Sequence, residues 1–180
     1  DEVIKSQIDP RDNIETTRDL FVVACWTGLR FGDWKDLSEA EINNDTMVVH
    51  THKTNTTVVI PLHPMVKAII AKYGGVLPKS VDKSKTLKHI RKCAEWASIS
   101  EPVSLSRVKG GQTEIKNGAK HDFLMNYTAR RSFATNMYLK GVPTISIMAI
   151  TGHTTEANFL KYIKVDKLQH AKIVAQAFAQ

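Results

Sequence analysis

The chain has 180 residues, 42% of them hydrophobic, so it can bury one core but is too short for two full domains. Its formal net charge of +7 and its pI near 9.4 favour an anionic partner, and nucleic acid is the commonest such partner of a basic domain. The sequence contains no run of roughly eighteen consecutive apolar residues, which a membrane-spanning helix needs, so we expect no membrane partner.

We expect residues 1–180 to form a single domain. The chain starts at Asp1 rather than at a methionine and soon enters a helical pattern, which predicts a fragment cut at a domain boundary. The two cysteines, Cys25 and Cys93, make no metal or disulfide framework, so we expect a reducing, cytoplasmic setting. Both lie in apolar or helical segments and are predicted to be buried, inert thiols.

In chain order, residues 9–10 predict a turn, and a helix is expected to start within residues 13–17 and to end at Gly28. A second short helix near residues 33–37 should follow at once. Arg30 would then lie at the start of that second helix, and the tight junction would fix the direction of its side chain.

Two β-branched runs, residues 47–50 and 57–60, are separated by a polar segment and predict a hairpin with Lys53 in its turn. Residues 99–126 are harder to interpret and predict either a surface hairpin or a flexible loop. The remaining segments predict amphipathic helices over residues 64–73, 84–97, 128–140, 144–150 and 168–178. Together these elements predict a mainly helical α+β fold with a small antiparallel β-sheet.

The last third of the chain is the most informative about function. Residues 127–135 read YTARRSFAT, Gly152 and His153 follow, and Tyr162 comes nine positions after that histidine. Arginine can hold two phosphate oxygens, histidine can donate or shuttle a proton, and a tyrosine hydroxyl can attack phosphorus. The pattern therefore indicates chemistry on a phosphate, and Arg30 and Lys53 would complete such a site.

Taken in order, these motifs resemble those of the tyrosine recombinases, also called phage-type integrases. The resemblance rests on TGLRFGD at residues 27–33, the hairpin lysine, the YTARRSFAT segment, the Gly-His pair and the spacing from that histidine to Tyr162. It implies the catalytic domain of that family, of the kind carried by mobile genetic elements. From the resemblance we expect the family's N-terminal domain, which clamps the other face of the DNA, to be absent from this chain.

The resemblance also implies a role for each residue. Arg30 and Arg130 would hold the non-bridging oxygens of the scissile phosphate, so no metal or other cofactor is expected. Lys53 would protonate the leaving 5′ oxygen, and His153 would hydrogen-bond the phosphate. Tyr162 would attack phosphorus to give a 3′-phosphotyrosyl link, which keeps the bond energy and makes ATP unnecessary.

Tyr127 departs from the family pattern, which usually has a histidine three residues before the second arginine. A phenol is a poor proton acceptor near pH 7, so Tyr127 cannot inherit a general-base role, although it could hydrogen-bond the phosphate. We therefore expect Tyr127→His to raise the rate of strand cleavage. Asp33, three residues after Arg30, is expected to brace the Arg30 guanidinium.

Three functions stay open at this point: a site-specific recombinase that integrates or excises a mobile element, a type IB topoisomerase, and a catalytically decayed DNA-binding module. The resemblance implies double-stranded DNA attachment sites, a homotetramer on DNA, and accessory DNA-bending or directionality factors as partners, near the nucleoid. His50, His52 and His63 suggest zinc, but no cysteine or carboxylate completes a recognisable spacing. The chain has no glycine-rich phosphate loop, which argues against an NTPase.

Overall fold

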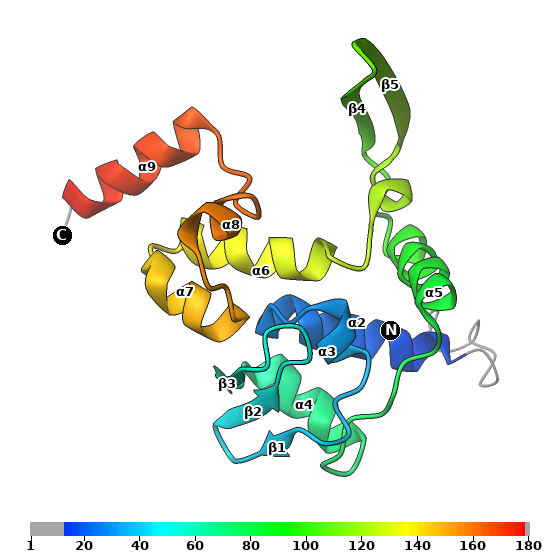
Figure 1. The fold of residues 1–180 in the computed structure, drawn as a ribbon. Coiled ribbons are helices and arrows are strands. Elements are labelled where there is room, and N and C mark those ends of the chain that lie inside the picture. The colour runs from blue at the N-terminus through cyan, green and yellow to red at the C-terminus, as the bar shows by residue number, and fades with distance from the viewer. Residues whose placement is uncertain (1–12, 179–180) are drawn as a thin grey trace. The chain divides into compact units, whose positions relative to one another are not determined.

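The computed structural model describes residues 13–178, so the turn expected at residues 9–10 lies outside the described residues (Figure 1). The chain divides into two compact units. The smaller unit comprises Asp1–Arg18 and Ser80–Asn126, and the larger unit comprises Asp19–Lys79 and Tyr127–Gln180. Helix α2 (Ile14–Thr27) belongs to both, because its first turn is in the smaller unit.

The smaller unit contains one long helix and one hairpin. Helix α5 (Lys83–Trp96) begins where the Asp82 carboxylate accepts hydrogen bonds from two backbone N–H groups of the first turn. Strands β4 (Pro102–Lys109) and β5 (Gln112–Ala119) pair antiparallel, and the 3₁₀ helix η2 (Lys120–Phe123) follows. Gly110 and Gly111 form the turn with φ of +57° and +78°, so the hairpin alternative for residues 99–126 is the one present.

In the larger unit, a three-stranded antiparallel sheet follows the first helices, with strand order β1-β2-β3. Burial alternates along β2 and β3, as it does when one face of a sheet covers a core and the other meets water. The elements are α3 (Phe31–Trp34), β1 (Glu41–Ile42), β2 (Thr46–His50), β3 (Thr57–Pro61) and α4 (Pro64–Lys72).

The C-terminal part of the larger unit is helical and packs around a small apolar core. This core consists of Phe133, Ala134, Ile147 and Phe159, and Tyr162 packs against it. The helices are α6 (Thr128–Leu139), α7 (Thr144–Thr151), α8 (Glu156–Leu160) and α9 (Lys167–Phe178). None of the helices within residues 13–178 is both long and apolar enough to cross a bilayer.

The predicted fold class, a mainly helical α+β protein with small antiparallel sheets, is confirmed. All the predicted helices and the Lys53 hairpin are present, with ends within a few residues of those expected. Strand β1 and helices η2 and α8 were not predicted. Cys25 and Cys93 are only partly buried, so the expectation that both thiols are buried was wrong.

Candidate active site

Arg30 lies in the tight junction between α2 and α3. Gly28 ends α2 with φ of +67°, and a Cβ at this position would lie only 2.4 Å from Cδ1 of Phe133, so the junction requires glycine. Arg30 is the N-cap residue of α3. Its Nη2 donates a hydrogen bond of 3.1 Å to the carbonyl oxygen of Gly152, which directs the guanidinium toward the loop that carries His153.

Arg130 is a buried cation on α6, with only 1% of its surface exposed. Its Nη1 donates to the carbonyl oxygen of Gly28 at 2.9 Å, and its Nη2 lies 2.9 Å from Nε2 of His153. Burial and the nearby charge of Arg30 lower the pKa of Arg130 to about 10, so it stays charged at neutral pH. The guanidinium carbon lies 5.4 Å from the centre of the Tyr162 ring.

His153 follows the left-handed Gly152, which ends α7 with φ of +65°. The imidazole is half-buried, and its Nδ1 lies 2.7 Å from Oγ1 of Thr151. Burial and the charges of Arg130 and Arg30 lower the pKa of His153 to about 4. The ring is therefore neutral at pH 7, and one of its nitrogens can accept a proton.

Tyr162 lies directly after the short helix α8, and its backbone is held at both ends. Its N–H donates to the carbonyl oxygen of Phe159 at 2.8 Å, and its own carbonyl oxygen accepts a 3.2 Å hydrogen bond from Oγ1 of Thr135. The phenol ring lies 4.9 Å, centre to centre, from the His153 ring. The structure therefore brings the histidine and the tyrosine of the sequence pattern into contact.

Lys53 is exposed in the turn between β2 and β3. Asp33 fixes this turn, because its Oδ1 accepts a 2.9 Å hydrogen bond from the backbone N–H of His52. The expectation that Asp33 braces Arg30 was wrong, because the carboxylate of Asp33 bonds the hairpin instead. The other oxygen, Oδ2, is buried and without a hydrogen-bond partner in the described part of the chain.

These side chains surround a cavity of about 310 Å³ within the larger unit. Its lining residues are Arg30, Lys53, Thr54, His153, Thr154, Asn158, Lys161 and Tyr162. Two buried guanidinium nitrogens near the cavity, Nη1 of Arg30 and Nε of Arg130, have no hydrogen-bond partner among residues 13–178. Unpaired donors on two cations beside a polar cavity are suited to binding a singly or doubly charged oxyanion.

Tyr127 is not among the residues that line this cavity. It is the N-cap residue of α6, its side chain is 46% exposed, and its ring lies 4.9 Å from the guanidinium carbon of Arg131. The structure therefore brings four of the six predicted site residues to the cavity wall and a fifth, Arg130, into contact with two of them, and it places the sixth against the next turn of its own helix.

Comparison with known proteins decides the family, because residues 5–169 match the profile of the phage integrase family. The chain belongs to the phage integrase family. It is 25% identical over 158 residues to tyrosine recombinase XerC of Rickettsia typhi (strain ATCC VR-144 / Wilmington), across 86% of this chain and 48% of that protein. The integrase-family chain thus spans about half the length of the curated relatives it matches.

Solved structures show the same fold at low sequence identity. XerH recombinase in a post-cleavage complex with palindromic difH substrate superposes with a TM-score of 0.64 at 16% identity, over 97% of this chain and 48% of that one. XerA recombinase superposes with a TM-score of 0.64 at 16% identity, over 91% of this chain and 63% of that one. A lambda integrase dimer bound to a COC′ core site superposes with a TM-score of 0.57 at 17% identity, over 84% of this chain and 55% of that one. The family and its fold, as the motifs predicted, are confirmed.

Several residues of this integrase-family site were not predicted from the sequence. Thr135 and Thr151 contact Tyr162 and His153 through their hydroxyl groups, and Lys161 donates to Oδ1 of Asn158 at 2.9 Å on the cavity wall. Thr135 belongs to the YTARRSFAT segment and Thr151 directly precedes the Gly-His pair, so their motif positions were the available signals. Asn158 and Lys161 lie outside the quoted motifs, and no signal marked them.

The three histidines of the zinc interpretation do not converge. His50 bonds Asn55 and Thr57 within its hairpin, whereas His63 caps α4 and stacks on Trp26 with the ring centres 3.5 Å apart. Across the described residues, no group of three histidine, cysteine or carboxylate side chains could hold a metal ion. The zinc alternative therefore has no structural support in this part of the chain.

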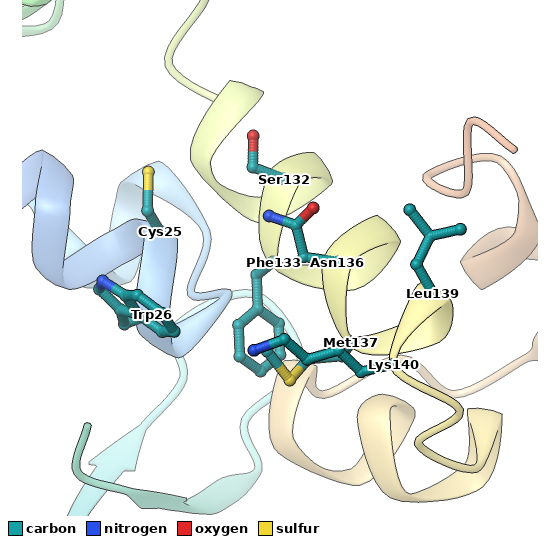
Figure 2. Close-up of a pocket in the computed structure, with 8 residues that line it drawn as sticks. All are labelled: Cys25, Trp26, Ser132, Phe133, Asn136, Met137, Leu139 and Lys140. Carbon is teal, nitrogen blue, oxygen red and sulfur yellow. The ribbon is translucent and has the colours of Figure 1, made fainter.

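A second, more apolar cavity of about 460 Å³ lies between α2 and α6 (Figure 2). Cys25 and Trp26 line it from α2, Phe133 and Met137 line it from α6, and Lys140 lines it from the C-cap of α6. Burial raises the pKa of Cys25 to about 12, so its thiol stays protonated at neutral pH. Inertness of this thiol therefore follows from desolvation, although the side chain is only partly buried.

Proposed function

We propose that this chain is the catalytic part of a site-specific DNA recombinase, an integrase that cleaves and rejoins DNA strands through a 3′-phosphotyrosyl intermediate during integration or excision of a mobile element. One observation carries the proposal: Arg30, Lys53, His153 and Tyr162 line one cavity, and Arg130 contacts both His153 and Tyr162. Membership of the phage integrase family supports it, as do relatives solved with DNA substrates.

The two arginines bind and polarise the scissile phosphate in this proposal. Nη1 of Arg30 and Nε of Arg130 are the unpaired buried donors, and each can bond a non-bridging oxygen. As phosphorus becomes five-coordinate, negative charge grows on these oxygens, and fixed cations in a partly buried site stabilise it strongly. Charge stabilisation of this kind needs no metal ion.

The nucleophile needs to lose a proton, and His153 is the acceptor in this proposal because its ring contacts that of Tyr162. The neutral imidazole contacts the Tyr162 ring, and its Nε2 faces Arg130. The Tyr162 proton moves to Nε2, the phenolate oxygen bonds phosphorus, and the bond from phosphorus to the 5′ oxygen breaks. Lys53 gives a proton to that leaving oxygen. Attack by a 5′ hydroxyl on the phosphotyrosyl link reverses each transfer and rejoins the strand.

Tyr127 does not argue for a decayed site under this mechanism. Its ring lies on Arg131 and lines no part of the cavity, whereas the five other residues keep the functional groups that the reaction needs. His153 then supplies the proton acceptor that the Tyr127 phenol does not. A type IB topoisomerase would use the same groups, so relaxation of supercoils without strand exchange would favour that alternative.

The proposal extends to the whole protein. Residues 1–180 act as one catalytic domain on double-stranded attachment sites, in the cytoplasm and at the nucleoid. The full-length enzyme works as a homotetramer with accessory DNA-bending or directionality factors. Relatives solved on DNA substrates support the DNA partner, and the DNA-bound lambda integrase dimer supports self-association on DNA.

The test is covalent trapping on nicked suicide substrates that carry candidate attachment-site cores, resolved by denaturing electrophoresis. The nick lets the short 5′ fragment diffuse away, so the linked product accumulates. We expect a slow-migrating protein–DNA band that Tyr162→Phe abolishes. Tyr138→Phe is the matched control, because it makes the same chemical change on a tyrosine outside the cavity and should keep the band. A band that persists in Tyr162→Phe would refute the assigned nucleophile.

A further inference from the structure

Thr151 connects the end of α7 to His153 through its side-chain hydroxyl. We propose that Thr151 is a positioning residue that keeps the proton of neutral His153 on Nδ1, so that the lone pair of Nε2 faces Arg130 and Tyr162. This inference deepens the proposed function and rests on it for its catalytic consequence. The hydroxyl of Thr151 is buried, and the residue is 1% exposed.

The hydroxyl group of Thr151 has one proton and two close polar neighbours. Oγ1 lies 2.7 Å from the carbonyl oxygen of Ile147, which can only accept, and 2.7 Å from Nδ1 of His153. A contact to the carbonyl oxygen of Met148 is longer, at 3.4 Å. The proton therefore goes to Ile147, and Oγ1 is left to accept a hydrogen bond from Nδ1–H.

The contacts of the imidazole with Arg130 favour the same assignment. A guanidinium nitrogen can only donate, and Nη2 of Arg130 lies 2.9 Å from Nε2 but 3.2 Å from Nδ1 of His153. The shorter contact makes Nε2 the acceptor. A neutral imidazole carries one proton, so that proton is on Nδ1, where Thr151 accepts it.

The chemical consequence concerns the direction of proton transfer. When the scissile phosphate draws the Arg130 guanidinium toward its oxygens, Nε2 loses its hydrogen-bond donor and presents a free lone pair beside the Tyr162 ring. With the opposite tautomer, Nε2 would already carry a hydrogen and could not accept the phenol proton. Thr151 thus acts on the reaction through His153 and touches no reacting atom.

The site offers a matched pair of substitutions. The Thr151 methyl group packs at the Arg30 junction, where Cγ2 would lie 2.8 Å from a Cβ placed on Gly28. Thr151→Val keeps this methyl group and the branched shape but removes the hydroxyl. Thr151→Ser keeps the hydroxyl but removes the methyl group. The two variants therefore separate loss of packing from loss of the hydrogen bond.

The first measurement is nitrogen NMR of the 180-residue chain with ¹⁵N-labelled histidine near pH 7, with the His153 signals identified by their absence in His153→Gln. We expect a protonated, pyrrole-type Nδ1 and an unprotonated, pyridine-type Nε2 in the wild type and in Thr151→Ser. Thr151→Val should shift His153 toward the Nε2–H tautomer. A wild type that already has Nε2–H, or a Thr151→Val spectrum that matches the wild type, would overturn the inference.

The second measurement is the rate of covalent complex formation on the suicide substrate between pH 5 and 9. Loss of one neutral hydrogen bond predicts a rate lower by roughly tenfold in Thr151→Val, and a near-normal rate in Thr151→Ser. Equal rates despite a changed tautomer would overturn the positioning role. The NMR result requires no DNA, so a correct tautomer in a chain that never links to DNA would count against the proposed function instead.

Discussion

The surroundings of His153 change the chemistry of its imidazole. Arg130 on α6 and Arg30 beside α3 face the imidazole, the Tyr162 ring lies against it, and the Thr151 hydroxyl bonds it. Burial and the two cations lower its pKa from 6.5 to about 4. In the unfolded chain the pKa returns to its ordinary value. Between pH 6.5 and about pH 4, His153 therefore binds a proton in the unfolded state but not in the folded state.

We expect the free energy of unfolding to fall as the pH is lowered from about 6.5 to about 4, and His153 to contribute to that fall. Above pH 6.5 both states are neutral at this residue, so it contributes no slope. In His153→Gln, which stays neutral and can still bond Arg130, the loss of stability over this window should be smaller. Urea unfolding at a series of pH values measures the difference, and parallel curves for the two proteins would contradict the prediction.

Tyr127 provides a second prediction at the residue scale. Tyr127→His places a group that can accept a proton near pH 7 at the start of α6, so it should raise the rate of covalent complex formation, by roughly tenfold. Tyr127→Phe is the control, because it keeps the ring that lies on Arg131 and removes only the hydroxyl. An unchanged or lower rate in Tyr127→His on the same suicide substrate would reject the hypothesis.

At the scale of elements, the junction of α2 with α3 sets the position of both arginines. Gly28 has φ of +67°, its carbonyl oxygen accepts from Arg130, and an added Cβ would meet Phe133 at 2.4 Å and Thr151 at 2.8 Å. Gly28→Ala should therefore lower the free energy of unfolding by about 3 kcal/mol, from backbone strain and overpacking together. Urea unfolding measures the loss.

Gly74 is the matched control for this junction. It has a nearly equal φ of +69°, but an added Cβ there would meet nothing within 4 Å. Gly74→Ala should lower the free energy of unfolding by about 1 kcal/mol, the backbone contribution alone. If both variants lose the same free energy of unfolding, the close approach of Phe133 and Thr151 to Gly28 does not affect stability.

The hairpin of β2 and β3 depends on Asp33 in a comparable way. Its carboxylate accepts from the N–H of His52, next to Lys53, and Asp33 is 3% exposed. Asp33→Ala should release the turn and slow cleavage by roughly tenfold, whereas Asp33→Asn keeps an acceptor oxygen and should lose less. A substrate with sulfur in place of the 5′ bridging oxygen tests whether Asp33 acts through Lys53, because a thiolate leaves without needing a proton from Lys53. An equal loss on both substrates would show that Asp33 does not act through Lys53.

Local sequence signals explain which elements could be predicted. Helices α2 and α6 are long enough to show an apolar period, and glycine or proline marks their ends, so their positions followed from the sequence. Strand β1 has two residues and α8 has five, which is too short for any period to appear. The motif positions of Arg30, Arg130, His153 and Tyr162 predicted that they would meet, and they do.

Contacts between distant segments could not be predicted in the same way. Asp33 was paired with Arg30 because the two are three residues apart, yet its carboxylate bonds His52, 19 positions away. The helix-face argument failed because Arg30 caps α3 with extended backbone and so does not share a helix face with Asp33. Tyr127 turned toward Arg131, four residues on, rather than toward the cavity. Only the packed fold decides between such partners.

For the whole molecule, the distribution of positive charge matters more than its sum. The chain has 25 lysines and arginines against 18 aspartates and glutamates, and several lysines form ion pairs with neighbouring carboxylates, Lys67 with Asp45 for example. The cavity cations differ from these. Within residues 13–178, no ion pair involves Arg30, Lys53 or Lys161, and Lys161 bonds the neutral amide of Asn158 instead. Three cations that no carboxylate neutralises therefore line this cavity.

DNA binding should accordingly weaken steeply as salt rises, because each phosphate that a lysine or arginine neutralises releases a counterion. In Lys161→Ala, we expect the slope of log K against log salt concentration to become shallower by roughly one. Fluorescence anisotropy with a labelled duplex over a salt series measures both slopes, with Tyr162→Phe as the background to prevent cleavage. Lys67→Ala is the control, since its ammonium is paired with Asp45 and lies outside the cavity lining. If the two variants reduce the slope equally, the effect comes from net charge, and the cavity has no special part in holding the backbone.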